Sequence, residues 1–426
     1  MSLKMIKPFD ITDSNMTSSV AEPDLSQGEI EWVDPDVLGG FENTFRKVEN
    51  SVLYDNKIYC FSNSRDVAVL DITDDSITVY ANLLPTANGR NVPVVTDDGV
   101  IYTHPNKDEG IFKLDISTMT ASQIGVASQA CYAGALGSDG NAYFVGDAPD
   151  LADPGRVILI HPSSDSIFAV EGGYTGKYYA CEVADNRAIY CIGDSGKVLK
   201  VNIDSQTTEE FGSHTWRYNT MSKGSDGHMY CAGNSGQILK IDTNSDSLSV
   251  FGSIVEYYDG SCAGFGDEIL ISGRILEDGV LKIPIVSLDV TTQSIRKIYS
   301  DQFNFGEIST MNYSGYNDVA YGIGEDYIAK VNPPSAAGDN VAIISTHKKY
   351  EASANTRSNP ITGVNLNPPS WVEVSATNKY KAFDYAISTK SIMDASTAKL
   401  TFTPGQAATN IALFGLEDVT RVYVKV

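Results

Sequence analysis

Short runs of apolar residues alternate with polar residues along most of this chain, and turns rich in Asp, Asn and Gly separate the runs. The clearest example occurs twice: residues 189–200 (Ile-Tyr-Cys-Ile-Gly-Asp-Ser-Gly-Lys-Val-Leu-Lys) have a close copy at residues 229–240, forty positions later. Alternation with a period of two is typical of strands in a half-buried sheet, and Asp-Gly turns favour hairpins. We therefore expect short antiparallel strands throughout the repeated region.

The same unit can be followed seven times from Arg46 onward. Each copy has an apolar-aromatic pair after a turn, with the aromatic lost in the sixth; the pairs are Ile58-Tyr59, Ile101-Tyr102, Ala142-Tyr143, Ile189-Tyr190, Met229-Tyr230, Ile269-Leu270 and Ala320-Tyr321. An apolar run precedes the pair, a third strand that often ends in Asp follows it, and a polar fourth strand closes the unit, as expected for an edge facing water. Four short strands at a period near forty residues are typical of β-propellers. The sequence thus predicts an all-β fold, a seven-bladed β-propeller of four-stranded blades.

The propeller is predicted to span residues 46–350, with residues 341–345 as the strand that completes the seventh blade. Residues 1–45 do not fit the repeat and are interpreted as an N-terminal arm. Residues 351–370 are rich in Pro and Asn and predict a linker. Residues 371–426 predict a small C-terminal β-domain. Its expected strands are residues 371–374, 399–403, 409–414 and 421–426.

The charge of the chain bears on its partners. The 426 residues include 54 acidic and 31 basic ones, which gives a formal net charge of −23. Such a surface repels phosphate backbones, so we do not expect a nucleic-acid partner. No apolar run reaches the roughly 18 residues that cross a membrane. The N-terminus also lacks a basic segment followed by an apolar one, so we expect neither membrane insertion nor a secretion signal.

The cysteine and histidine patterns predict no metal site, no cofactor and no catalytic residues. Cys60, Cys191 and Cys231 each follow the tyrosine of the repeat, at one position of three different units. Equivalent positions of different blades lie apart, so we interpret the cysteines as small buried hydrophobes. The five histidines have no metal-binding or triad spacing, and the Asp-rich turns lack the order of a calcium loop.

Aromatic residues concentrate in the loops that lead into the innermost strands, where a propeller exposes the mouth of its channel. The candidate ligand-binding residues are Arg90, Tyr132, Lys177, Tyr178, Tyr179, Trp216, Arg217, Tyr218, Tyr257 and Tyr258. Phe303 and Phe305 are candidates for the same part in the last unit. Aromatic rings stack on sugars or anchor peptides, and arginine binds hydroxyl or carboxyl groups, so these residues predict a ligand funnel. The alternative is that the rings pack between blades and close the propeller.

Two blocks outside the propeller resemble virion proteins of bacteriophages. The C-terminal block contains Pro369-Ser370-Trp371-Val372-Glu373-Val374, Thr377-Asn378-Lys379-Tyr380-Lys381-Ala382-Phe383-Asp384, Thr403-Pro404-Gly405-Gln406 and Ala412-Leu413-Phe414-Gly415-Leu416. The N-terminal block contains Ile11-Thr12-Asp13, Ser18-Ser19-Val20 and Glu22. The chain departs from the group at Ser375-Ala376, which replaces Gly-Pro, and at Met16, which replaces a leucine.

This resemblance covers about 70 residues. It implies a protein of the phage or prophage particle, tail-associated or otherwise, whose two ends contact other virion proteins. It would be located in the virion, or in the host cytoplasm before assembly. The propeller itself resembles kelch-like and quinoprotein-like propellers, although it has neither a Trp-Asp dipeptide nor the kelch double glycine.

Three functional hypotheses are compatible with these patterns. The first is a non-enzymatic virion-associated structural or recognition protein whose propeller presents a binding face, for example to a host-surface glycan or protein. The second is a propeller-type polysaccharide hydrolase or lyase with Glu182, Asp259 and Glu307 as acid/base candidates. Glycoside chemistry requires two carboxylates roughly 5–10 Å apart. The third is a purely architectural particle protein with the propeller as a rigid spacer.

Overall fold

The structure of the chain is a computed structural model, in which two compact units are distinguished. One unit is Pro35–Pro333, and the other combines Met1–Asp34 with Pro334–Val426. The structure describes residues 16–18, 30–31, 37–38, 48–62, 64–85, 91–104, 109–126, 128–148, 154–253, 257–263, 267–277, 280–282, 285–299, 308–316, 319–324, 328–331, 340–343, 348–353, 364–365, 368–369, 371–376 and 400–402. All regular elements in these ranges are β-strands.

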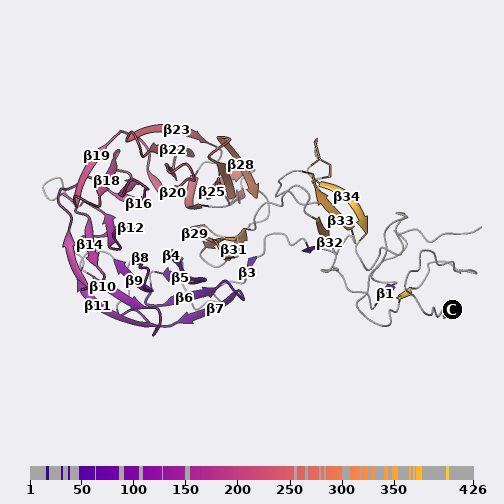
Figure 1. Ribbon diagram of the computed structural model, residues 1–426, viewed down its shortest axis with the longest axis horizontal. Helices are drawn as coiled ribbons and strands as arrows, with labels where there is room; N and C mark the ends of the chain where they lie inside the picture. The colour runs from indigo at the N-terminus through magenta and orange to yellow at the C-terminus, as the bar shows by residue number, and fades with distance from the viewer. Residues whose placement is uncertain are drawn as a thin grey trace, which may run out of the picture. The chain divides into compact units, whose positions relative to one another are not determined.

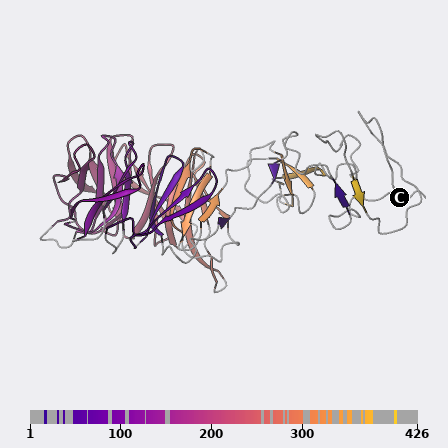
Figure 2. The ribbon, with the colours of Figure 1, turned by 90° about the horizontal axis from the view of Figure 1, so that it is seen from below.

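Seven sheets stand radially around one axis (Figure 1), which confirms the predicted seven-bladed propeller of four-stranded antiparallel blades. The first strand of each blade is innermost, and Figure 2 shows the ring edge-on. The first four blades are β4 (Val48–Tyr54), β5 (Lys57–Ser62), β6 (Val67–Asp71) and β7 (Ser76–Tyr80); β8 (Val92–Val95), β9 (Val100–His104), β10 (Gly110–Asp115) and β11 (Thr120–Val126); β12 (Cys131–Leu136), β13 (Ala142–Gly146), β14 (Ile158–His161) and β15 (Ser166–Ala169); and β16 (Tyr178–Val183), β17 (Ala188–Gly193), β18 (Val198–Asn202) and β19 (Thr207–Phe211). The fifth and sixth blades are β20 (Tyr218–Lys223), β21 (Met229–Gly233), β22 (Gln237–Asp242) and β23 (Ser247–Ser253); and β24 (Tyr257–Ala263), β25 (Glu268–Glu277), β27 (Ile285–Asp289) and β28 (Ser294–Tyr299), with β26 (Val280–Lys282) paired to β25.

The seventh blade is closed by a strand from the N-terminal region. It consists of β29 (Ile308–Ser314), β30 (Val319–Gly324), β31 (Ile328–Val331) and β3 (Val37–Leu38). The prediction that residues 341–345 complete this blade is therefore wrong, because β32 (Asn340–Ile343) pairs in a different sheet. A strand of two residues carries almost no alternation, so the sequence pattern did not mark β3.

The second unit contains a four-stranded sheet in the order β2 (Ile30–Glu31), β32, β33 (Lys348–Ala352) and β34 (Trp371–Ala376). Trp371 is fully buried and packs with Tyr350 and Ala352. A separate pair joins β1 (Met16–Ser18) to β35 (Leu400–Phe402). The strands predicted at residues 371–374 and 399–403 thus correspond to β34 and β35, whereas those at 409–414 and 421–426 lie outside the described residues.

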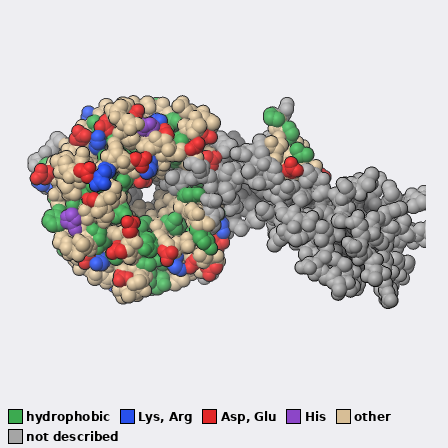
Figure 3. Space-filling model, in the orientation of Figure 1, with side chains coloured by type: hydrophobic (Ala, Val, Ile, Leu, Met, Phe, Trp, Pro, Cys, Tyr) green, Lys and Arg blue, Asp and Glu red, His purple; other side chains and the backbone are tan. Residues whose placement is uncertain are grey.

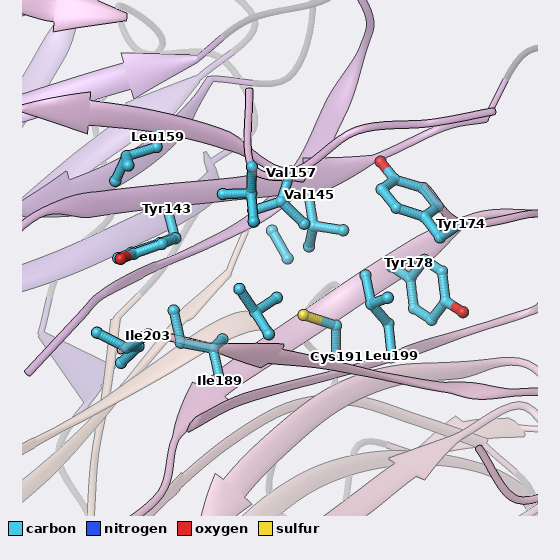
Figure 4. Packing of buried hydrophobic residues seen from close by; sticks show 13 residues of the cluster. Tyr143, Val145, Val157, Leu159, Tyr174, Tyr178, Ile189, Cys191, Leu199 and Ile203 are labelled. Carbon is cyan, nitrogen blue, oxygen red and sulfur yellow. The ribbon is translucent and has the colours of Figure 1, made fainter. Parts of the chain in front are cut away.

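The apolar core of the propeller lies between neighbouring blades. In Figure 4, Tyr143 and Val145 of the third blade pack with Ile189, Cys191 and Leu199 of the fourth. Corresponding clusters join the first blade to the second, the second to the third, the fourth to the fifth and the fifth to the sixth. Another combines strands of the first and last blades. Because burial of apolar area drives folding, packing between blades closes the ring.

The cysteines behave mainly as predicted. Cys60, Cys131, Cys191 and Cys231 are free and buried, and burial raises the pKa of each of the thiols of Cys60 and Cys231 far above the ordinary range. Two cysteines of one blade nevertheless lie side by side, because Cys181 on β16 is the register partner of Cys191 on β17.

Aspartates in the outer turns tie blades together through what we call inter-blade clamps. In each clamp, an Asp between the third and fourth strands accepts hydrogen bonds from the blade before it; the clamps are Asp165 with Tyr102 and Lys113, Asp246 with Tyr190 and Lys200, and Asp75 with Lys330. Burial alone would raise the pKa of Asp165, but its hydrogen bonds hold that pKa below the ordinary value. The clamp at Asp75 joins the last blade to the first.

Candidate ligand-binding site at the channel mouth

A β-bulge recurs where the innermost strand of a blade begins. On β16, Tyr178 is the register partner of Gly193 and Ala180 that of Ile192, so Tyr179 has no partner on β17. The same shift occurs at the start of β4, β12, β20 and β29. Bulges change the direction of a side chain without ending the strand. In the third to fifth blades, the bulge residues are Tyr132, Tyr179 and Asn219.

In the third to fifth blades, a glycine at the end of the second strand accommodates this bulge. An added β-carbon at Gly193 would lie 1.9 Å from the Lys177 carbonyl oxygen, and at Gly233 it would lie 2.2 Å from that of Arg217. The residue after the glycine then donates its N–H to that same carbonyl, at 3.0 Å from Asp194 and 2.9 Å from Asn234. The close approach therefore places a polar side chain beside each bulge residue.

These repeated positions combine into one group of side chains, the mouth cluster: Tyr132, Asp147, Lys177, Tyr179, Asp194, Arg217, Asn219 and Asn234. The rings of Tyr132 and Tyr179 are stacked with centroids 5.3 Å apart, and the Arg217 guanidinium carbon lies 4.0 Å from the Tyr179 centroid. Tyr179 belongs to the middle blade, so its two contacts come from the blades on either side. Stacking of the Tyr132 ring and of the Arg217 guanidinium on the Tyr179 ring is favourable and fixes the planes of these side chains.

Hydrogen bonds hold the polar members of the cluster. The Tyr179 hydroxyl donates to Asp194 at 3.1 Å, and Lys177 lies 2.9 Å from Asp147, an interaction that raises the pKa of Lys177. Arg217 donates its Nε–H to the Asn219 side-chain oxygen at 2.8 Å. Asn219 in turn donates to Asn234 at 2.9 Å. The cluster is thus a rigid rim built from three consecutive blades.

Below this rim lies a cavity of about 180 Å³ in the channel. Its lining comes from innermost strands and includes Tyr132, Tyr179 and Asn219 together with Ser51, Thr220 and Thr310. A hollow is visible at the centre of the ring in Figure 3, with side chains of both charges around it. The described residues that line the cavity include neither Asp nor Glu.

The candidate residues divide into two groups in the structure. Tyr178 and Tyr218 are buried, and the Tyr178 hydroxyl donates to Glu210 at 2.6 Å. These two rings therefore pack between blades, which was the alternative to a role in ligand binding. Tyr132, Lys177, Tyr179 and Arg217 meet in the mouth cluster, as reported above. Trp216 lies next to Arg217 in the chain, and 51% of its surface is exposed.

The remaining candidates lie outside what the structure describes, with the exception of Glu182. Arg90, Phe303, Phe305 and Glu307 lie outside the described residues, as do the side chains of Tyr257, Tyr258 and Asp259 on β24. Glu182 is described: burial raises the pKa of its carboxyl, and the Val183 N–H donates to it at 3.0 Å.

The sequence reasoning missed Asp147, Asp194, Asn219 and Asn234. A signal for three of them existed, because Gly-Asp or Gly-Asn follows the tyrosine-bearing strand at Gly146, Gly193 and Gly233. In the part of the chain that the structure describes, no group of His, Cys, Asp and Glu could hold a metal ion. No helix long and apolar enough to cross a membrane occurs there either.

Comparison with solved structures shows the same class of fold. Virginiamycin B lyase from Staphylococcus aureus superposes with a TM-score of 0.58 at 17% identity, over 70% of this chain and 98% of that chain. A streptogramin B lyase gives 0.55 at 15% identity, over 74% and 97%. The WD40 propeller domain of Doa1 gives 0.55 at 10% identity, over 70% and 97%.

These similarities define the chain as a β-propeller protein and do not extend to function, because propellers carry many unrelated activities. No family model matches the chain, and no curated protein matches it in sequence.

Proposed function

We propose that this protein is a non-enzymatic, virion-associated recognition protein whose propeller binds a host-surface glycan at the mouth of its channel. The mouth cluster is the observation that carries the proposal. Three consecutive blades place aromatic, cationic and amide groups at one rim, and each uses the same bulge to do so. Sites that recognise a ligand need such rigid polar groups beside aromatic surface.

A glycan fits this site better than an apolar ligand does. Sugars combine flat faces that stack on aromatic rings with hydroxyl groups that need directional hydrogen bonds. Trp216 offers exposed aromatic surface, whereas Asn219, Asn234 and Arg217 offer donors and acceptors. A polysaccharide hydrolase or lyase, the alternative, would require two facing carboxylates. The described lining of the cavity supplies none.

The second unit supports the proposed attachment to a particle. Met16–Ser18 lies in the N-terminal block that resembles virion proteins, and Leu400–Phe402 directly precedes Thr403-Pro404-Gly405 of the C-terminal block. These two strands pair with each other. The blocks that flank the propeller in sequence thus contribute to one compact unit, as a single attachment module would.

The test is binding of the full-length protein to a glycan array and to host cells. We expect Trp216→Ala and Tyr179→Ala to weaken binding, because the first removes exposed aromatic surface and the second removes the centre of the stack. Tyr316→Ala is the matched control: Tyr316 is 63% exposed and follows the innermost strand of its blade, at the opposite face of the ring. Unchanged binding in both mouth variants would contradict the proposed site, and failure of the unaltered protein to bind would favour an architectural role.

A further inference from the structure

Arg217 has no carboxylate partner among the described residues. Most described lysines and arginines of the propeller pair with carboxylates, for example Lys177 with Asp147 and Lys223 with Asp185. Among the described residues, Arg217 has an amide, Asn219, as its hydrogen-bond partner and a ring, Tyr179, as its stacking partner. In a chain of net charge −23, a cation at the channel mouth without a carboxylate partner is available to a ligand.

The orientation of the guanidinium group is fixed before any ligand arrives. Its Nε–H donates to the Asn219 side-chain oxygen at 2.8 Å, and its central carbon lies 4.0 Å from the centroid of the Tyr179 ring. The N–H groups on the two terminal nitrogens remain as parallel donors. Arginine binds a carboxylate through two such parallel hydrogen bonds, and a side chain held in place loses little entropy when it does so.

The loop that precedes Arg217 carries an exposed aromatic side chain. Trp216 is 51% exposed, although large aromatic side chains usually are buried. Its backbone is held by His214, whose Nδ1 and Nε2 lie 2.9 and 3.0 Å from the carbonyl oxygens of Trp216 and Lys197. The His214 ring also makes an edge-on contact with Tyr218, 5.2 Å between centroids. The loop is therefore anchored at the rim.

The acidic members of the mouth cluster each have a partner within the cluster. Asp147 pairs with Lys177, and Asp194 accepts a hydrogen bond from the Tyr179 hydroxyl. Arg217 has no carboxylate partner among the described residues, so an anionic ligand would find its terminal donors open. We propose that the mouth binds the carboxylate of an acidic sugar, with Arg217 as its anchor and Trp216 as the surface on which the sugar ring lies.

This inference rests on the proposed function and is tested with defined probes. Full-length protein is titrated with polygalacturonate oligomers and sialyl-lactose, with the carboxyl-reduced form of each, and with polyglycerol phosphate. We expect an acidic glycan to bind about 10- to 100-fold more tightly than its reduced form, the effect of a charged bidentate contact. Arg217→Gln should abolish that preference, and Arg217→Lys should restore it only in part because lysine lacks the planar fork.

Several outcomes would overturn the inference. Acidic and reduced glycans could bind with equal affinity while Trp216→Ala still abolishes that binding. Such a result would support glycan binding at the mouth and refute the role of the carboxylate. If polyglycerol phosphate were the only probe to bind, the anionic group that the mouth recognises would be a phosphate, and the inference of a carboxylate would be wrong. Failure of every probe and of host cells would refute the proposed function as well. Circular dichroism and the melting temperature of each variant, compared with Tyr316→Ala, exclude loss of fold as the cause.

Discussion

Replacing Gly193 with alanine should disturb the mouth through the backbone alone. The new β-carbon would lie 1.9 Å from the Lys177 carbonyl oxygen and 2.7 Å from the Tyr178 α-carbon, whereas real β-carbons keep at least 3.0 Å. The two innermost strands of the fourth blade must therefore separate by about 1 Å. That movement displaces Tyr179, the centre of the mouth cluster.

The expected cost follows from overpacking of a close backbone contact. Such insertions typically cost about 1–3 kcal/mol. For a unit as large as Pro35–Pro333, an unfolding entropy of roughly 2 cal/mol/K per residue means that each kcal/mol lowers the melting temperature by about 1.6 °C. Thermal denaturation followed by circular dichroism should thus show a loss of roughly 2–5 °C. Binding to the best glycan of the array should weaken in the same variant.

Gly315→Ala provides the control, because its added β-carbon meets nothing within 4 Å. It should leave the melting temperature and glycan binding near the wild-type values. The reasoning is refuted if Gly193→Ala is as stable as Gly315→Ala, since the glycine would then not be needed for the close approach of the strands.

Three further changes test other parts of the structure. Asp246→Asn breaks an inter-blade clamp and should lower the melting temperature by several degrees, whereas Asp204→Asn, at an exposed ion pair, should change it little. The folded-state pKa of Asp165 is lowered, so its stabilising effect is present above the unfolded pKa near 4 and is lost as the pH falls through the folded value. The urea midpoint should therefore fall on acidification below about pH 4, and fall less in Asp165→Asn. Trp371→Ala removes a fully buried side chain of the second unit and should lower the free energy of unfolding of that unit by about 3–5 kcal/mol. Limited proteolysis should then degrade the second unit and spare the propeller.

The repeated blades could be predicted because their signals are local. The tyrosine-bearing strands, such as β17 and β21, read as continuous apolar runs since both of their faces are buried. The Asp at the end of the third strand accepts N–H groups of the following turn, as Asp71 does from Thr73 at 3.0 Å. Strand, turn and burial therefore agree within each unit.

The closing strand and the exact site could not be predicted in the same way. Val37–Leu38 pairs with residues nearly three hundred positions later, and a two-residue strand has no period. At the mouth, Tyr178 and Tyr179 are adjacent in sequence, yet one is buried and the other belongs to the mouth cluster. Alternation does not reveal which is which, because the bulge interrupts it.

Hydrogen–deuterium exchange tests the central claim most directly, because it locates a bound ligand along the backbone. The account predicts that the best-binding glycan of the array slows exchange at residues 131–133, 178–180 and 213–219, around the mouth cluster. Exchange at the opposite face, around Tyr316, should not change. Protection confined to that face or to the second unit would contradict the claim that the propeller recognises its ligand at the channel mouth.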